Sequence, residues 1–172
     1  MIMKLAGIAM IVFSCFGLGI IKSMEIQKRY RLLKEWERLL LFLEQEISYH
    51  VPLPEAYRRV GDRTQPPFDG FLKSLARRLQ NGKGESFGNI LEEESRRCLG
   101  SSCLSEEDLQ NISMMGQMLG FGDRQAQGVM LKRYEKELEG KLEELKEQLP
   151  GKQKLYRSLG FLGGAFLGIL LL

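Results

Sequence analysis

The feature that most constrains this chain is an uncharged run near its N terminus that passes into a helical pattern without a break. Leu5–Ile21 carries no charged residue and is close to the shortest length, roughly 17 residues, that crosses a bilayer. No proline follows before Pro52. The apolar positions in between recur every three or four residues, as on one side of an amphipathic helix: Ile26, Tyr30, Leu33, Trp36, Leu40, Leu43 and Ile47. We therefore predict one long helix that leaves a membrane and continues into a helical domain.

The flanking charges predict that residues 1–21 stay attached as an anchor. Lys4 precedes the apolar run as in a cleaved signal peptide, but no small-residue cleavage site follows it. The charged residues directly after the run are mostly basic: Lys22, Lys28, Arg29 and Arg31, opposed by Glu25. By the positive-inside rule, everything from Lys22 onward is predicted to lie in the cytoplasm.

The charged residues of the chain are concentrated in its middle and are balanced in sign. All 22 acidic residues, and all 25 basic residues except Lys4, lie between Lys22 and Arg157. A surface so balanced provides no general attraction for nucleic acid. The three cysteines are odd in number and lack metal-ligand spacing, which is typical of unpaired thiols in a reducing compartment.

The middle of the chain, residues 22–151, predicts an all-α bundle of about six helices, without strands. Pro52 and Pro54 should end the first helix near His50. Ser105 should cap the fifth helix, with acidic residues in its first turn. The apolar stripe of that helix includes Met115, and the Met114, Met115 and Met118 group suits core packing better than an adaptable contact surface. The other predicted helices are Glu55–Arg63, Phe68–Leu79, Glu85–Leu99 and Arg124–Leu149.

The last part, residues 152–172, predicts a second, short membrane segment. Pro150–Gly151 should break the preceding helix, and three basic residues then lead into the uncharged tail Leu159–Leu172. Gly160, Gly164 and Gly168 recur every four residues and leave a smooth face for close helix packing. They fit a two-helix membrane hairpin or contact with another subunit, and equally the ordinary glycine content of membrane helices.

Residues that could carry chemistry are few. His50 is the sole histidine, so no Ser-His-Asp set with a second base can be assembled. Gly82-Lys83-Gly84 lacks the earlier glycine and the Ser or Thr of a phosphate-binding loop. Cys98 and Cys103 are not spaced as a redox pair, and Glu44 and Glu46 are expected on exposed helix faces. We therefore predict no catalytic residue, no cofactor and no metal site.

Three arginine pairs, Arg58–Arg59, Arg77–Arg78 and Arg96–Arg97, could bind an acidic partner or anionic lipid heads. They alternate with acidic residues, which favours a mixed, solvated surface.

Over essentially its full length the chain resembles the stage III sporulation protein AB family of endospore-forming bacteria. The resemblance rests on Leu40–Ala56, which reads LLFLEQEISYHVPLPEA, on Leu119–Gln127, which reads LGFGDRQAQ, and on the glycine-bearing tail SLGFLGGAFLGILLL. It assigns Glu44, Glu46, Tyr49, Pro52 and Glu55 to a corner between the first two soluble helices. It assigns Gly120, Asp123 and Arg124 to the opposite turn. These residues are expected to be structural first and contact residues second.

The resemblance also implies a function. The family's soluble domain is similar to the cytoplasmic domains of F-type platform proteins in type II secretion and type IV pilus systems. It implies a non-catalytic subunit of a channel complex in the mother-cell membrane facing the forespore, with other channel subunits and possible homo-oligomers. The implied cytoplasmic partner is a secretion-like ATPase, stage III sporulation protein AA. Two alternatives stay open from the residues alone: a membrane-tethered adaptor without an ATPase, and a membrane-bound enzyme.

Overall fold

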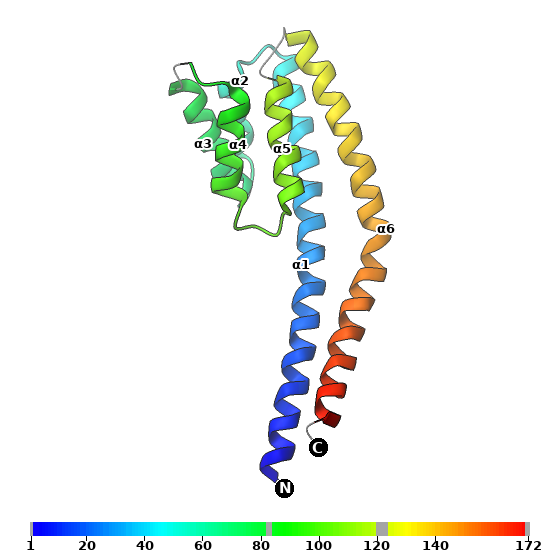
Figure 1. Cartoon of the computed structure of the whole chain (residues 1–172). Helices are drawn as coiled ribbons and strands as arrows, with labels where there is room; N and C mark the ends of the chain where they lie inside the picture. The colour runs from blue at the N-terminus through cyan, green and yellow to red at the C-terminus, as the bar shows by residue number, and fades with distance from the viewer. Residues whose placement is uncertain (1, 82–83, 120–123, 171–172) are drawn as a thin grey trace. The chain divides into compact units, whose positions relative to one another are not determined.

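The computed structural model describes residues 2–81, 84–119 and 124–170, and these residues form helices and turns without a strand (Figure 1). The predicted all-α fold with six helices is confirmed for this part of the chain. The helices are α1 (Ile2–Ser48), α2 (Leu53–Asp62), α3 (Phe68–Asn81), α4 (Phe87–Leu99), α5 (Glu106–Leu119) and α6 (Arg124–Leu170).

The chain forms two compact units, and α1 and α6 contribute to both. The central unit is Leu32–Leu142, and the terminal unit combines Met1–Arg31 with Glu143–Leu172. Within the central unit, α2 packs on α3, α3 on α4 and α4 on α5. Figure 1 shows these four short helices grouped beside the C-terminal half of α1.

The core of the central unit is centred on Trp36 of α1, which is fully buried. Its ring stacks on Phe68 with centroids 5.6 Å apart and meets Phe71 at 6.0 Å, which ties α1 to α3. Its indole Nε1–H donates to the hydroxyl of Tyr134 on α6 at 3.3 Å. The buried α1 positions follow the predicted helical spacing: Leu33, Trp36, Leu40, Leu43 and Ile47, with Leu39 beside them.

The connection between α1 and α2 forms where the prolines predicted it. α1 ends at Ser48, and His50 adopts a left-handed conformation with φ of 63°. Such a conformation is uncommon for a residue with a side chain and reverses the chain sharply. Pro52 occupies the N-cap position of α2, and Pro54 lies in its first turn, where a missing N–H costs nothing.

The start of α5 confirms the cap predicted at Ser105. The Ser105 hydroxyl accepts from the backbone N–H of Asp108 at 3.2 Å, and the Asp108 carboxylate accepts from the N–H of Ser105 at 2.9 Å. This reciprocal pair satisfies two donors at the helix start. Lys141 of α6 reaches the same place, with its ammonium 3.4 Å from Asp108 and 2.7 Å from Glu107.

Two predictions of inward-facing side chains are wrong. The apolar spacing of Met130, Tyr134, Leu138 and Leu142 predicts that Met130 faces inward, but Met130 is exposed and Leu131 is buried in its place. Met114 is exposed whereas Met115 is buried. Adjacent helical residues differ in direction by about 100°, so both could not face the same neighbour.

The terminal unit is a pair of antiparallel helices with both termini at the same end (Figure 1). A Cβ on Gly19 of α1 would lie 2.6 Å from the carbonyl oxygen of Tyr156 and 3.3 Å from the Cα of Gly160 on α6. The two backbones therefore approach at these glycines, as small residues allow. Ser23, one helical turn further along α1, is buried.

The prediction that Pro150 and Gly151 break the last helix is wrong, because α6 continues through both. Proline has a φ compatible with a helix, and its ring removes one hydrogen bond, to the carbonyl four residues earlier. That residue, Lys146, is exposed, as is Pro150. The lost bond can thus be replaced by water, which makes the proline tolerable.

Across the described part of the chain, no helix has a stretch both long and apolar enough to cross a membrane. The membrane-spanning helices predicted for residues 1–21 and for the C-terminal tail are therefore not supported by the structure.

A glycine pair tests the close packing of α4 on α5. A Cβ on Gly116 would lie 2.9 Å from the Cβ of Leu91 and 3.3 Å from the Cα of Gly88. Gly116→Ala should lower the free energy of unfolding by about 1–3 kcal/mol, because neither atom can rotate away. The control is Gly140→Ala, where a Cβ meets nothing within 4 Å; it should stabilise α6 by about 0.5–1 kcal/mol. Urea unfolding measures both, and an unchanged Gly116→Ala variant would contradict the packing.

Candidate functional site

The α1–α2 corner brings two of its predicted glutamates onto one arginine. The Arg59 guanidinium lies 3.2 Å from the carboxylate of Glu46 on α1 and 2.9 Å from that of Glu55 on α2. Arg58 also binds Glu55, through two nitrogens at 2.7 and 2.9 Å. Hydrogen bonds from Arg58 and then Arg59 lower the pKa of Glu55 to about 2. The corner is therefore held by an ionic cluster that bridges both helices.

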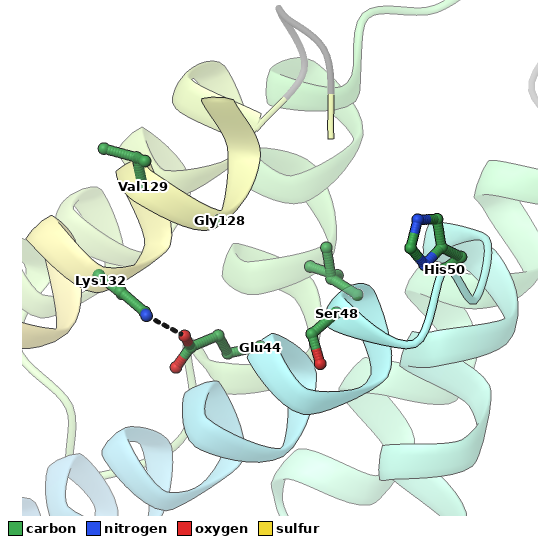
Figure 2. A pocket seen from close by; sticks show the side chains of 7 residues that line it. Glu44, Ser48, His50, Gly128, Val129 and Lys132 are labelled. Carbon is green, nitrogen blue, oxygen red and sulfur yellow. Dashed lines mark ion pairs between the residues drawn. The ribbon is translucent and has the colours of Figure 1, made fainter. Parts of the chain in front are cut away.

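Glu44 makes a separate connection to α6. Its carboxylate lies 3.2 Å from the ammonium of Lys132, and Figure 2 shows the two side chains pointing toward one another. The pair borders an open pocket of about 490 Å³ whose lining is Glu44, Ile47, Ser48, His50, Gly128, Val129 and Lys132. The Ser48 hydroxyl donates to the backbone carbonyl of Gln45 at 2.7 Å, so it is engaged within its own helix.

Tyr49 differs from its neighbours in the motif because it is turned outward. Its side chain, just past the end of α1, is 72% exposed, and Leu41 and Phe42 in the last two turns of α1 are 47% and 42% exposed. The Arg38 guanidinium lies 6.0 Å from the centre of the Phe42 ring. We call Leu41, Phe42 and Tyr49 the outer face of α1.

The other predicted positions are only partly described. Pro52 is the N-cap residue of α2 and is exposed. Gly120 and Asp123 lie outside the described residues, and Arg124 is the first residue of α6. Gly160 contributes to the contact with Gly19. Gly164 and Gly168 lie within α6, but their surroundings are outside the description.

Five of the six arginines in the three arginine pairs bind carboxylates in a mixed ionic surface, as predicted, whereas Arg77 has no ion pair among the described residues. Arg78 of α3 binds Glu85 at 2.8 Å and Glu93 at 2.6 Å, and it lies 3.4 Å from Glu94. Glu94 is buried on α4 and also accepts a hydrogen bond from Arg97. The sequence pattern did not predict this buried carboxylate, although its place between Arg78 and the Arg96–Arg97 pair was a signal for it.

The described residues do not assemble a reactive centre. Among them, no group of histidine, cysteine and acidic side chains could hold a metal ion. Cys98 and Cys103 are half-buried free thiols. Burial raises the pKa of Cys98, and its thiol donates to Glu94 at 3.7 Å. A thiol with a raised pKa is a poor nucleophile at neutral pH.

Comparison with known proteins gives a match over nearly the whole chain. Residues 4–172 match the sequence model of a family described as stage III sporulation protein AB. A protein of that name from Bacillus subtilis (strain 168) is 25% identical over 171 residues, which are 99% of each chain. A solved structure of the same name superposes with a TM-score of 0.64 at 22% identity, and covers 71% of this chain and 96% of that one. The structural likeness shows a shared fold.

The ionic cluster predicts how stability responds to acid. Glu55 titrates near its ordinary value of about 4.3 in the unfolded chain, but its folded pKa is about 2. As the pH falls, the unfolded state takes up this proton first. The stability that Glu55 contributes is therefore complete above about pH 5 and is lost as the pH falls toward 2.

Glu55→Gln should make the free energy of unfolding depend less on pH in this acidic range. Urea unfolding at a series of pH values measures the effect. Glu143→Gln is the control, because Glu143 is exposed and forms no ion pair among the described residues. If the free energy of unfolding falls equally steeply at low pH in the wild type and in Glu55→Gln, Arg58 and Arg59 do not hold this carboxylate in solution.

Proposed function

The chain belongs to the stage III sporulation protein AB family and therefore has a role in sporulation; within that role, we propose that it is a non-catalytic platform subunit. On this proposal it links a cytoplasmic secretion-like ATPase, stage III sporulation protein AA, to the mother-cell membrane that faces the forespore. The observation that carries the proposal is that α1 and α6 each run as one helix from the terminal unit into the central unit.

Attachment to a membrane is supported by the surface of the terminal unit. Its large apolar side chains are widely exposed to solvent: Met10, Leu18, Ile21, Leu155, Leu159, Phe161, Leu162 and Phe166. Apolar surface of this extent marks a contact with a membrane or another protein. The uncharged run Leu5–Ile21 and the uncharged tail Leu159–Leu172 favour lipid. The basic residues that adjoin both runs support a cytoplasmic location for the central unit.

Coupling between the ATPase and the membrane requires a stiff connection. An isolated flexible linker between the two units would absorb motion, because it can adopt many lengths. A helix instead keeps a rise of about 1.5 Å per residue along its length. Two helices that continue from one unit into the other therefore suit a subunit that transmits a push or a rotation. Such a role needs no catalytic residue in this chain.

The outer face of α1 is the surface that we assign to the ATPase. Leu41, Phe42 and Tyr49 are exposed on the central unit. Glu44 and Glu46 on the adjoining sides of the helix are already engaged, by Lys132 and Arg59. The motif thus combines residues that shape the corner with an aromatic residue free to meet a partner.

A flexible insertion tests transmission. A Gly-Ser pair placed between Arg31 and Leu32, at the boundary of the two units, should leave the protein expressed and membrane-bound but abolish heat-resistant spores. The same pair inserted after Gly84 is the control, because that residue is exposed and a Cβ there would meet nothing within 4 Å. Normal spore counts from the Arg31 insertion would rule out coupling through rigid helices.

Co-purification in mild detergent tests the ATPase contact. Tyr49→Ala should weaken recovery of the ATPase by about ten-fold in affinity, because truncating an anchoring aromatic residue at an interface typically costs this much or more. Met114→Ala is the control, since Met114 is an exposed apolar residue on α5 of the same unit. If the wild-type protein retains only soluble regulators and no ATPase, the chain is instead a tethered adaptor.

A further inference from the structure

The basic residues of the two units differ in how they are paired. In the central unit, most lysines and arginines lie within 4.0 Å of a carboxylate; Arg58, Arg59, Arg78, Arg97 and Lys132 are examples. In the terminal unit, Lys152, Lys154 and Arg157 are exposed and have no ion pair among the described residues. These three lie within six residues of one another on α6. Their positive charge is therefore available to an external anion.

The packing of α1 on α6 shows which residues of α1 lie beside these three cations. Gly19 faces Tyr156 and Gly160, and the helices are antiparallel. Residues 152–157 of α6 therefore lie beside about residues 20–25 of α1. We call this section of the helix pair the level of the three cations. Lys22 and Glu25 share this level, and their side chains bind each other at 2.7 Å. The level as a whole thus carries three uncompensated positive charges.

The thickness of this level matches one headgroup layer. Six helical residues rise about 9 Å. The polar region on each side of a bilayer is about 5–8 Å thick, half the difference between the full bilayer and its hydrocarbon core. Exposed apolar residues lie on the side toward the termini, among them Leu18, Leu159 and Leu162. Tyr156 lies within the level itself, and tyrosine is enriched at the membrane–water interface.

We infer that Lys152, Lys154 and Arg157 form a collar around α6 that binds the phosphates of anionic phospholipid headgroups. At 100° per residue the three side chains point in different directions around the helix, with Lys154 and Arg157 one turn apart on neighbouring faces. They can therefore contact several lipids rather than enclose one ligand. Among the described residues, no carboxylate lies within 4.0 Å of any of the three, and Glu25 beside them is paired with Lys22.

The lipid surface explains why these three neighbouring cations are left unpaired, whereas most cations of the central unit lie within 4.0 Å of a carboxylate. Each lysine or arginine near an anionic surface strengthens association by about five-fold, and the effect fades within a Debye length of about 8–10 Å. A carboxylate at the same depth would cancel that attraction. This inference rests on the membrane attachment proposed above, and it adds the class of lipid that the terminal unit selects.

The experiment measures lipid selectivity with the full-length protein. It is reconstituted in bilayers that contain equal amounts of phosphatidylcholine and phosphatidylglycerol, and spin-labelled versions of each lipid report the fraction held at the protein surface. The test variant replaces all three collar residues by glutamine. The control variant is R63Q/R77Q/K136Q, because these three central-unit cations are also exposed and unpaired among the described residues.

The wild type and the control variant should both favour phosphatidylglycerol at low salt. Lys152→Gln, Lys154→Gln and Arg157→Gln together should remove that preference, by about five-fold for each cation lost. High salt should weaken the wild-type preference. Equal selectivity of the collar variant and the wild type, or equal losses in both variants, would overturn the inference. Insertion without any lipid preference overturns the collar alone, whereas failure to enter bilayers of either lipid overturns the membrane attachment as well.

Discussion

The central unit depends on the burial of one tryptophan. Trp36 places its ring against Phe68 and Phe71 of α3 and satisfies its indole N–H on Tyr134 of α6. A large apolar side chain contributes strongly to stability only when its polar atom also finds a partner. Tyr134 is 98 residues after Trp36, so this contact joins parts of the unit that are far apart in the chain. The shorter helices α2, α4 and α5 then need only short turns to pack against their sequence neighbours.

The ion pairs on the surface of that unit have a different role. Exposed pairs each stabilise a protein by at most about 1 kcal/mol, so the cluster around Arg59 does not hold the fold together. They define direction instead: Arg59 fixes α2 against the end of α1, and Arg78 fixes α3 against α4. The residues of the motif therefore have two different roles. Its glutamates are engaged in orienting helices, and Tyr49 remains exposed beside them.

The terminal unit follows another principle, because two helices alone cannot enclose a core. Gly19 and Gly160 bring the backbones together, which maximises contact between small residues but leaves the large apolar side chains outside. In water such a surface would favour aggregation. The arrangement is favourable if Leu159, Phe161 and their neighbours lie in an apolar environment whose border meets the unpaired cations. The same surface and the same cations therefore support one proposal about the membrane.

The sequence by itself determined the local structure of this protein. Helical periodicity predicted the buried face of α1, the prolines predicted its end, and Ser105 predicted the start of α5, because each depends on residues within one or two turns. Tertiary structure alone decided which charges meet: Glu44 with Lys132 and Arg78 with Glu94 come from separate helices. It also decided that Leu131 rather than Met130 is buried, and that the helix continues through Pro150. Periodicity identifies a face only to within a residue, and the environment of a proline depends on what surrounds it, so neither outcome could be read from the chain.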